Sequence, residues 1–272
     1  MNLSFKIVDS TGRIKAQNRD TKEVSLFFEG TYEPGDEIVF ECENTPANVC
    51  LMLDDALGKS LVYVTGEVRY KIPFMEKRLN ISPKAFMGDR HLLYAREAKA
   101  FELNTYRNLA QNSYDQHDTT TMFPHAVANV ETRGESVFAA SNAIDGNVLN
   151  KGHGNWPYES WGINMRDDAH MAVEFGRPVK IDRINLYTRA DFPHDNYWTA
   201  VSFAFFDDER NQIKNMKVNL KKSYAPHEFV IEPIIASSFM LHHMIKSDDP
   251  SPFPALTQIE IFGIEEKEAL FI

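Results

Sequence analysis

Apolar and polar residues alternate along much of the first hundred positions. In residues 24–28, 38–42, 49–53, 61–65 and 68–72 the apolar side chains fall mainly on every second position. A period of two is typical of strands that bury one face against a core. Turn residues separate the segments, as in residues 33–36 (Glu-Pro-Gly-Asp). The pattern predicts an antiparallel β-sandwich in this part of the chain.

The pattern changes near residue 100. Residues 91–96 (His-Leu-Leu-Tyr-Ala-Arg) are compatible with a closing strand, whereas residues 97–103 favour a short helix by propensity. We therefore predict that residues 1–103 form an accessory β-sandwich domain that ends near this helix.

Alternation resumes in the second half of the chain. Strands are predicted within residues 171–175, 184–186, 201–205, 216–220, 229–231, 239–241 and 259–261, and long loops rich in polar and aromatic residues separate them. The predicted fold class of the whole chain is therefore all-β, with one sandwich in each half.

The charge balance excludes one class of partner. The 272 residues contain 29 Lys and Arg against 39 Asp and Glu, a formal charge of −10. Nucleic-acid binders place cations against phosphates, so no nucleic-acid partner is predicted. No apolar run reaches the roughly 18 residues of a membrane span, and the first residues lack a signal-peptide core. We predict no transmembrane segment and favour a cytoplasmic location unless a leader was removed, which leaves localisation open.

The sequence contains two cysteines, Cys42 and Cys50. A turn between them would allow a disulfide across a hairpin. However, Cys42 continues the apolar alternation of residues 38–42, which favours a buried thiol. The oxidation state stays open at this point.

Four segments together resemble a known family. They are residues 107–110 (Arg-Asn-Leu-Ala), residues 140–147 (Ala-Ser-Asn-Ala-Ile-Asp-Gly-Asn), residues 169–184, which include Phe-Gly, and residues 255–263, which end in Ile-Phe-Gly. With Trp161 between the second and third, their order and separation resemble the discoidin, or coagulation-factor 5/8 type C, domain. That family has a galactose-binding-like jelly-roll fold and includes carbohydrate-binding modules. The resemblance covers about residues 104–264 and leaves residues 265–272 as a solvated tail.

The resemblance also implies a structural Ca²⁺ site. In the family, the turn that corresponds to residues 145–147 binds Ca²⁺ through an Asp carboxylate and loop carbonyls, helped by a Glu of the closing strand. Here Asp145 matches the Asp, but Gln258 occupies the position where the Glu is usual. Calcium prefers six to eight oxygen ligands, and the loss of one charge should weaken the site. A simple turn held by Asx side chains is the alternative.

Three loops of the second half have the residues that sugar binding requires. They are residues 152–161, 189–198 and 246–253, which combine aromatic rings with polar side chains. A sugar presents an apolar face and a rim of hydroxyls, so its pocket needs an aromatic ring and a few fixed hydrogen-bonding groups. The predicted sugar-binding residues are Trp156, Arg189, Asp191, His194, Asn196, Tyr197 and Trp198.

Structural roles compete with each of these assignments. Trp161 matches a core position of the family. Arg189 and Asp191 are two residues apart and would form an ion pair that only fixes the loop. Tyr197 and Trp198 are adjacent, so one of them is expected to point into the core.

The sequence shows no catalytic signature. The histidine spacings match no zinc motif, and His242 and His243, adjacent in a predicted strand, are expected to lie on opposite faces. A Gly-x-Ser-x-Gly segment and a phosphate-binding glycine loop are both absent from the sequence. The favoured function is non-catalytic binding of a neutral sugar or glycan, alone or beside a larger enzyme or protein partner. A protein-interaction module is the alternative, and a small glycan-processing enzyme is a third interpretation.

Overall fold

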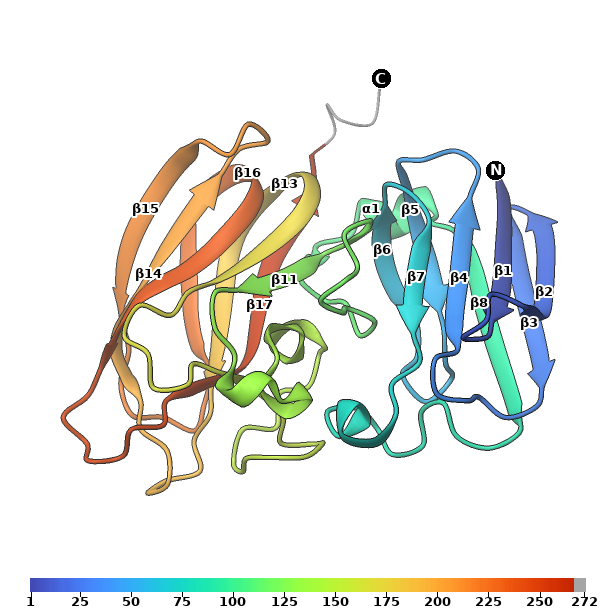
Figure 1. Cartoon of the computed structure of the whole chain (residues 1–272). Helices are drawn as coiled ribbons and strands as arrows, with labels where there is room; N and C mark the ends of the chain where they lie inside the picture. The colour runs from blue at the N-terminus through green and yellow to red at the C-terminus, as the bar shows by residue number, and fades with distance from the viewer. Residues whose placement is uncertain (267–272) are drawn as a thin grey trace.

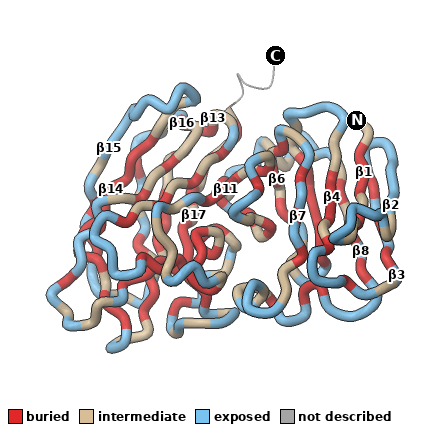
Figure 2. Tube along the Cα trace, viewed as in Figure 1, coloured by how far each residue is buried: buried red, intermediate tan, exposed pale blue. Residues whose placement is uncertain are grey.

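The computed structural model describes residues 1–266 and confirms the all-β fold class. The strands form three antiparallel sheets of four, five and eight strands, numbers that apply to the described residues. Two hydrophobic clusters lie inside them, one in the N-terminal half and one in the C-terminal half. The two halves lie side by side (Figure 1), and the buried positions follow the strands of each (Figure 2).

The N-terminal half is a sandwich of two sheets. The first sheet has the order β2-β1-β4-β7, and the second has the order β10-β6-β5-β8-β3. The strands are β1 (Asn2–Val8), β2 (Ile14–Thr21), β3 (Glu23–Glu29), β4 (Glu37–Cys42), β5 (Ala47–Met52), β6 (Ser60–Val64), β7 (Val68–Lys71), β8 (Arg90–Glu97) and β10 (Met122–Phe123). In β3, Val24, Leu26 and Phe28 are buried and their neighbours are exposed, as the alternation predicts.

Two short helices accompany this sandwich: the 3-10 helix η1 (Met75–Arg78) and the α-helix α1 (Ala100–Leu103), which follows β8. Both cysteines are free thiols. They cannot meet across a hairpin in this fold, because Cys42 ends a strand of the first sheet and Cys50 lies in the second.

The C-terminal half is built on the eight-stranded sheet. The path β12-β17-β13-β16-β14-β15 is joined by β9, which pairs with β17, and β11, which pairs with β13. The strands are β9 (Arg107–Asn108), β11 (His125–Ala128), β12 (Trp161–Gly162), β13 (Met171–Thr188), β14 (Trp198–Phe206), β15 (Gln212–Asn219), β16 (His227–Lys246) and β17 (Ala255–Glu265). Three 3-10 helices lie beside the sheet: η2 (Thr132–Gly134), η3 (Ser136–Phe138) and η4 (Ala140–Ile144).

One segment of the C-terminal half crosses to the N-terminal sandwich. Tyr114 and Met122 belong to the N-terminal hydrophobic cluster, and β10 pairs with β6. The Tyr114 hydroxyl donates a hydrogen bond to the carbonyl of Asp54 at 3.0 Å. The two halves are therefore tied together by shared core residues, and the division near residue 103 remains a prediction about folding units.

Glu265 is not part of a solvated tail, contrary to the sequence interpretation. It ends β17, is buried, and pairs with Arg107 and with Arg177, whose Nε lies 2.6 Å from a Glu265 oxygen. Although burial opposes ionisation, Arg177 and Arg107 hold the pKa of Glu265 below its ordinary value. The prediction of a solvated end for residues 267–272 lies outside the described residues. None of the helices in residues 1–266 is long and apolar enough to cross a bilayer.

Candidate functional site

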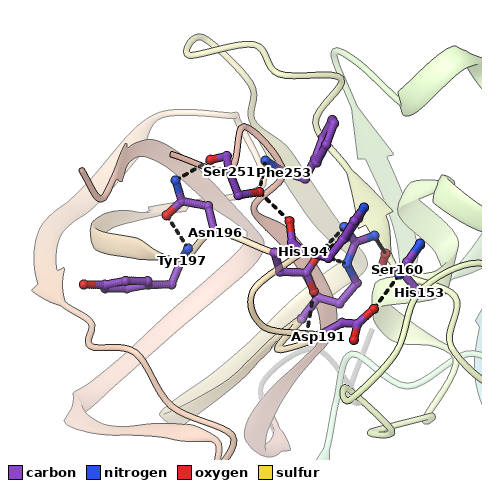
Figure 3. A network of polar contacts seen from close by, with 10 residues as sticks. His153, Ser160, Asp191, His194, Asn196, Tyr197, Ser251 and Phe253 are labelled. Atoms are coloured by element: carbon purple, nitrogen blue, oxygen red, sulfur yellow. Dashed lines mark hydrogen bonds and ion pairs between the residues drawn. The ribbon is translucent and has the colours of Figure 1, made fainter. Parts of the chain in front are cut away.

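Three loops meet at one end of the C-terminal sheet and, together with residues 132–138 and 162–165, line a cavity of about 210 Å³. They are the three loops that the sequence marks as rich in aromatic and polar groups. The cavity is lined by His153 from the first loop, Arg189 and His194 from the second, and Phe253 from the third. Figure 3 labels His153, His194 and Phe253 and shows the polar contacts around them.

Hydrogen bonds from asparagine side-chain amides hold the three loops in place. The Asn150 side chain donates to the carbonyl of Thr188 at 2.9 Å, which ties the first loop to the end of β13. The Asn196 side chain donates to the carbonyls of Asp249 and Ser251 at 2.9 and 2.6 Å, which ties the second loop to the third. The loops therefore present their side chains from a fixed frame.

Arg189 pairs with Asp195 and not with Asp191, so the predicted ion pair is corrected. Its Nε and Nη2 donate to Asp195 Oδ1 at 2.9 and 2.6 Å, and the carboxylate is fully buried. Asp195 is available because its backbone N–H donates to the Asp191 carbonyl at 3.0 Å, a tight turn that returns the chain towards Arg189. Arg189 Nη1 also donates to the Ser160 hydroxyl at 3.4 Å. Three of the five guanidinium N–H groups therefore have partners among the described residues, and two N–H groups have none.

Two histidines and one carboxylate lie together beside this ion pair. His153 Nδ1 is 2.6 Å from Asp191 Oδ2, and His194 Nδ1 is 3.1 Å from Asp195 Oδ1. The imidazole rings of His153 and His194 are stacked in parallel with their centroids 4.0 Å apart. These three side chains, His153, Asp191 and His194, could hold a metal ion. We call them the His-Asp-His group.

Phe253 supplies an aromatic ring at the same place. Its ring stacks on that of His194 with centroids 5.2 Å apart and is 41% exposed. An exposed ring next to hydrogen-bonding groups is the combination that a sugar face and its hydroxyl rim require. Sequence reasoning missed His153 and Phe253 as site residues, although both lie in the three loops that it selected.

Other predicted sugar-binding residues occupy different positions. Trp198 is 1% exposed in the core cluster, and Asn196 is buried with both its amide nitrogen and its carbonyl oxygen bonded to the loops. Neither can contact a sugar in this conformation, and Asn196 instead positions the third loop. Tyr197 is half-buried beside Lys222 and does not line the cavity.

Trp156 also lies outside the cavity lining. It is 42% exposed, and its backbone N–H donates to the carbonyl of Leu79 in the N-terminal half at 2.7 Å. The structure therefore brings together Arg189, Asp191 and His194 but does not bring Trp156 to them. Instead, the loop that contains Trp156 and His153 is braced by the N-terminal sandwich.

Gln258 reaches the turn of residues 145–147, where the family resemblance implies Ca²⁺, through the backbone of Gly146. The Gly146 N–H donates to Gln258 Oε1 at 3.3 Å, and Asp145 Oδ1 accepts from the Asn147 N–H at 2.7 Å. The sequence analysis missed a third participant, Glu159, which is 2% exposed and has one carboxylate oxygen without a partner. Burial, and then the neighbouring Glu159, raise the pKa of Asp145 well above its ordinary value, and burial raises that of Glu159.

These residues fit a hard cation. The half-buried Asp145 and the buried Glu159 repel each other when both carboxyl groups are ionised, and a divalent ion between them would remove that repulsion. Glu159 offers the carboxylate that the sequence lacks at Gln258. The donor set that would hold Ca²⁺ is therefore Asp145, Glu159 and the amide oxygen of Gln258.

His242 and His243 do not lie on opposite faces, contrary to the sequence prediction. Their Nδ1 atoms are 2.6 Å apart. The reason is local, because His243 has a φ of 47° and the pairing of β14 with β16 shifts register next to it. The positive φ breaks the alternation of the strand and turns both rings to one side.

Comparison with known proteins shows similarity to carbohydrate-binding modules. The chain is similar to a chitosan-binding module from a chitosanase/glucanase of Paenibacillus sp. IK-5, with 18% identity over 58% of this chain and 100% of that one, at a TM-score of 0.42. It is similar to the lectin domain of lectinolysin in complex with Lewis B antigen, with 17% identity over 57% of this chain and 96% of that one, at a TM-score of 0.42. It is also similar to a fucose-binding module of Streptococcus pneumoniae, with 15% identity over 59% of this chain and 96% of that one, at a TM-score of 0.42. No family model matches the chain, and no curated protein matches it.

Proposed function

We propose that this protein binds a neutral sugar or glycan end at the cavity beside Arg189, without cutting it. The observation that carries the proposal is the convergence of Arg189, His153, His194 and Phe253 from three separate loops on one cavity. The finer assignment of residues 104–264 as a discoidin-like domain belongs to the same proposal, because it rests on the motif resemblance.

Each part of a sugar has a matching group at this site. The two remaining Arg189 N–H groups would donate to ring or hydroxyl oxygens. Asp191 does not itself line the cavity, and it would orient the His153 ring that does. The partly exposed rings of Phe253 and His194 would cover the C–H face. The Arg189 guanidinium is fixed by Asp195, so little ordering of side chains is needed on binding.

The cavity size limits what can enter. At about 210 Å³ it is smaller than the 300–1,000 Å³ typical of drug-sized ligands. A single sugar residue at the end of a glycan would fill it, with the rest of the chain in solvent. One small site of this kind would bind weakly, with a Kd on the order of micromolar to millimolar.

A larger groove of about 790 Å³ lies on the first N-terminal sheet, but its lining does not match a sugar site. Its lining includes the charged residues Lys6, Arg19, Glu41, Glu43 and Glu67, while Phe5 beneath them is fully buried. A large apolar patch would favour the protein-interaction alternative, and this groove is not such a patch. We therefore place the function at the C-terminal loops and propose no catalytic step.

A glycan array followed by calorimetry would test the proposal on the full chain. We expect binding to at least one neutral glycan, and we expect His194→Ala and Phe253→Ala each to weaken it by about tenfold or more. The matched control is Phe101→Ala, which removes an exposed phenylalanine ring from α1, far along the chain from the loops. Because Trp156 does not line the cavity, Trp156→Ala should retain binding.

Two results would refute the proposal. One is the absence of binding to every neutral glycan at millimolar concentration. The other is binding that survives in both His194→Ala and Phe253→Ala but is lost in Trp156→Ala, which would move the site to another face of the first loop.

A further inference from the structure

The His-Asp-His group brings three potential metal ligands together from two loops. One ligand atom from each of His153, Asp191 and His194 lies within 4.8 Å of the others. Imidazole nitrogen and carboxylate oxygen are ligands that Zn²⁺ and similar transition ions accept. Nothing in the sequence spacing pointed to this group, because 37 residues separate His153 from Asp191 in the chain, or roughly 120 Å if that stretch were fully extended.

A buried carboxylate, Asp195, supports the His-Asp-His group through hydrogen bonds. His194 Nδ1 donates to Asp195 Oδ1 at 3.1 Å, which leaves Nε2 with its lone pair free for an ion. Asp195 is fixed in turn by Arg189 and by the Asp191 N–H at 2.8 Å. A histidine ligand that donates its other ring N–H to a held carboxylate is the usual arrangement around protein-bound metals, since it sets the tautomer and the ring direction.

The group also has room to close on an ion. The imidazole rings of His153 and His194 stack in parallel 4.0 Å apart, and a ring nitrogen binds a metal ion in the plane of its ring, so one ring has to turn before both can face the same ion. The two side chains are 40% and 42% exposed, which leaves space on the solvent side for that turn. Zn²⁺ bonds of about 2.0–2.2 Å in tetrahedral geometry place neighbouring ligand atoms roughly 3.3 Å apart. The observed limit of 4.8 Å therefore requires the ligand atoms to approach one another by about 1.5 Å or less, in addition to the turn of one ring.

We propose that His153, Asp191 and His194 form a binding site for a divalent transition metal ion of the Zn²⁺ class. Three protein ligands leave one coordination position for water or another small donor. The ion would bind without sugar present, although the site shares His153 and His194 with the cavity. It is also separate from the Asp145 and Glu159 carboxylates, whose all-oxygen donors suit Ca²⁺ instead.

Titration calorimetry of the full chain with Zn²⁺ at neutral pH, without sugar and without chelating buffer, tests this site. We expect one ion per chain, and a loss of affinity of about tenfold or more in each of His153→Ala, His194→Ala and Asp191→Asn. The matched control is the double variant His242→Ala/His243→Ala, which removes two other adjacent histidines and should leave the ion bound.

Titration with Co²⁺ gives a second readout. A His-Asp-His site predicts visible absorption typical of four-coordinate Co²⁺ without a thiolate charge-transfer band, which would mark binding at Cys42 instead. Circular dichroism of each variant would show that it is folded. Retained stoichiometric binding in folded His153→Ala and His194→Ala, or absence of binding to millimolar Zn²⁺, would overturn the site. Neither result would alter the glycan test, so the two proposals fail separately.

Discussion

The buried ion pair between Arg189 and Asp195 leads to a prediction about stability. Replacing Arg189 by Met keeps most of the apolar length of the side chain but removes the charge that faces Asp195. The Arg189 side chain is 5% exposed and the Asp195 side chain 0%. Breaking a buried pair by removing one partner typically costs about 3–5 kcal/mol, because it leaves an uncompensated buried charge. We therefore expect Arg189→Met to lower the free energy of unfolding by about that amount at pH 7.

A second substitution identifies the cause of that loss. In Arg189→Met the buried Asp195 carboxylate keeps only the His194 ring and the Asp191 N–H as partners among the described residues. The double variant Arg189→Met/Asp195→Asn should recover much of the loss, because the neutral amide oxygen that it introduces can still accept from the Asp191 N–H.

Urea unfolding followed by tryptophan fluorescence is a suitable assay. All three tryptophans lie in the C-terminal half, at positions 156, 161 and 198, so the signal reports on the half that contains the ion pair. A loss below about 1 kcal/mol for Arg189→Met, or a loss that the double variant Arg189→Met/Asp195→Asn does not recover, would refute the reasoning. A double-mutant cycle of the wild type, Arg189→Met, Asp195→Asn and the double variant gives the coupling energy of the two side chains, which separates the loss of the ion pair from the loss of packing.

Three further predictions concern titrating groups away from the cavity. Ca²⁺ at 100 times its Kd should stabilise the full chain by about 2.7 kcal/mol and so raise its Tm, and Glu159→Gln should lose most of that rise. A Tm that changes with neither Ca²⁺ nor a chelator would contradict a Ca²⁺ site at Asp145 and Glu159. Because the pKa of Glu265 is lowered, its stabilisation is present above its ordinary value of 4.5 and is lost as pH falls through the folded value. Urea unfolding should therefore show the gap between the wild type and Glu265→Gln closing from pH 7 to pH 3, and a constant gap would disprove it. Burial, and then the nearby His243 and His170, lower the pKa of His242. NMR titration should therefore find that His242 protonates at a lower pH than an exposed histidine, and that its pKa rises in His243→Ala.

Strands with one buried face could be predicted well from the sequence. The alternation in residues 24–28 became β3, and the change of pattern near residue 97 became the end of β8 and the start of α1. Strands without alternation were missed. The edge strand β2 is polar and largely exposed, so its sequence offers no period-two signal.

Irregular positions inside long strands also caused wrong predictions from the alternation pattern. β13 was expected as two segments, but it is one strand whose pairing is irregular between Glu174 and Val179. Gly176 lies in that interval with a φ of 69°, and a Cβ there would clash with the ring of Phe123. The extra residues bend the strand and shift the alternation, which an analysis of periodicity reads as two elements.

The site was predictable as a set of loops but not as a set of contacts. Composition selected the three loops, since rings and polar groups together are uncommon in simple turns. Which side chains face the cavity depends on the backbone path, as the turn that brings Asp195 under Arg189 shows. Proximity in sequence suggested Asp191 as the partner, and only the fold could show that the residue four positions later takes that role.

Asp195 links the two proposed ligands of this site. Its carboxylate accepts from Arg189, from His194 and from the Asp191 N–H, and so orients groups assigned both to the sugar and to the metal ion. Because His194 is shared, the sugar and the ion cannot bind with independent affinities. Thermodynamic linkage then requires that Zn²⁺ change the sugar Kd by the same factor as the sugar changes the Zn²⁺ Kd. A shared side chain predicts that this factor weakens both, unless the sugar itself takes the open coordination position, in which case it strengthens both.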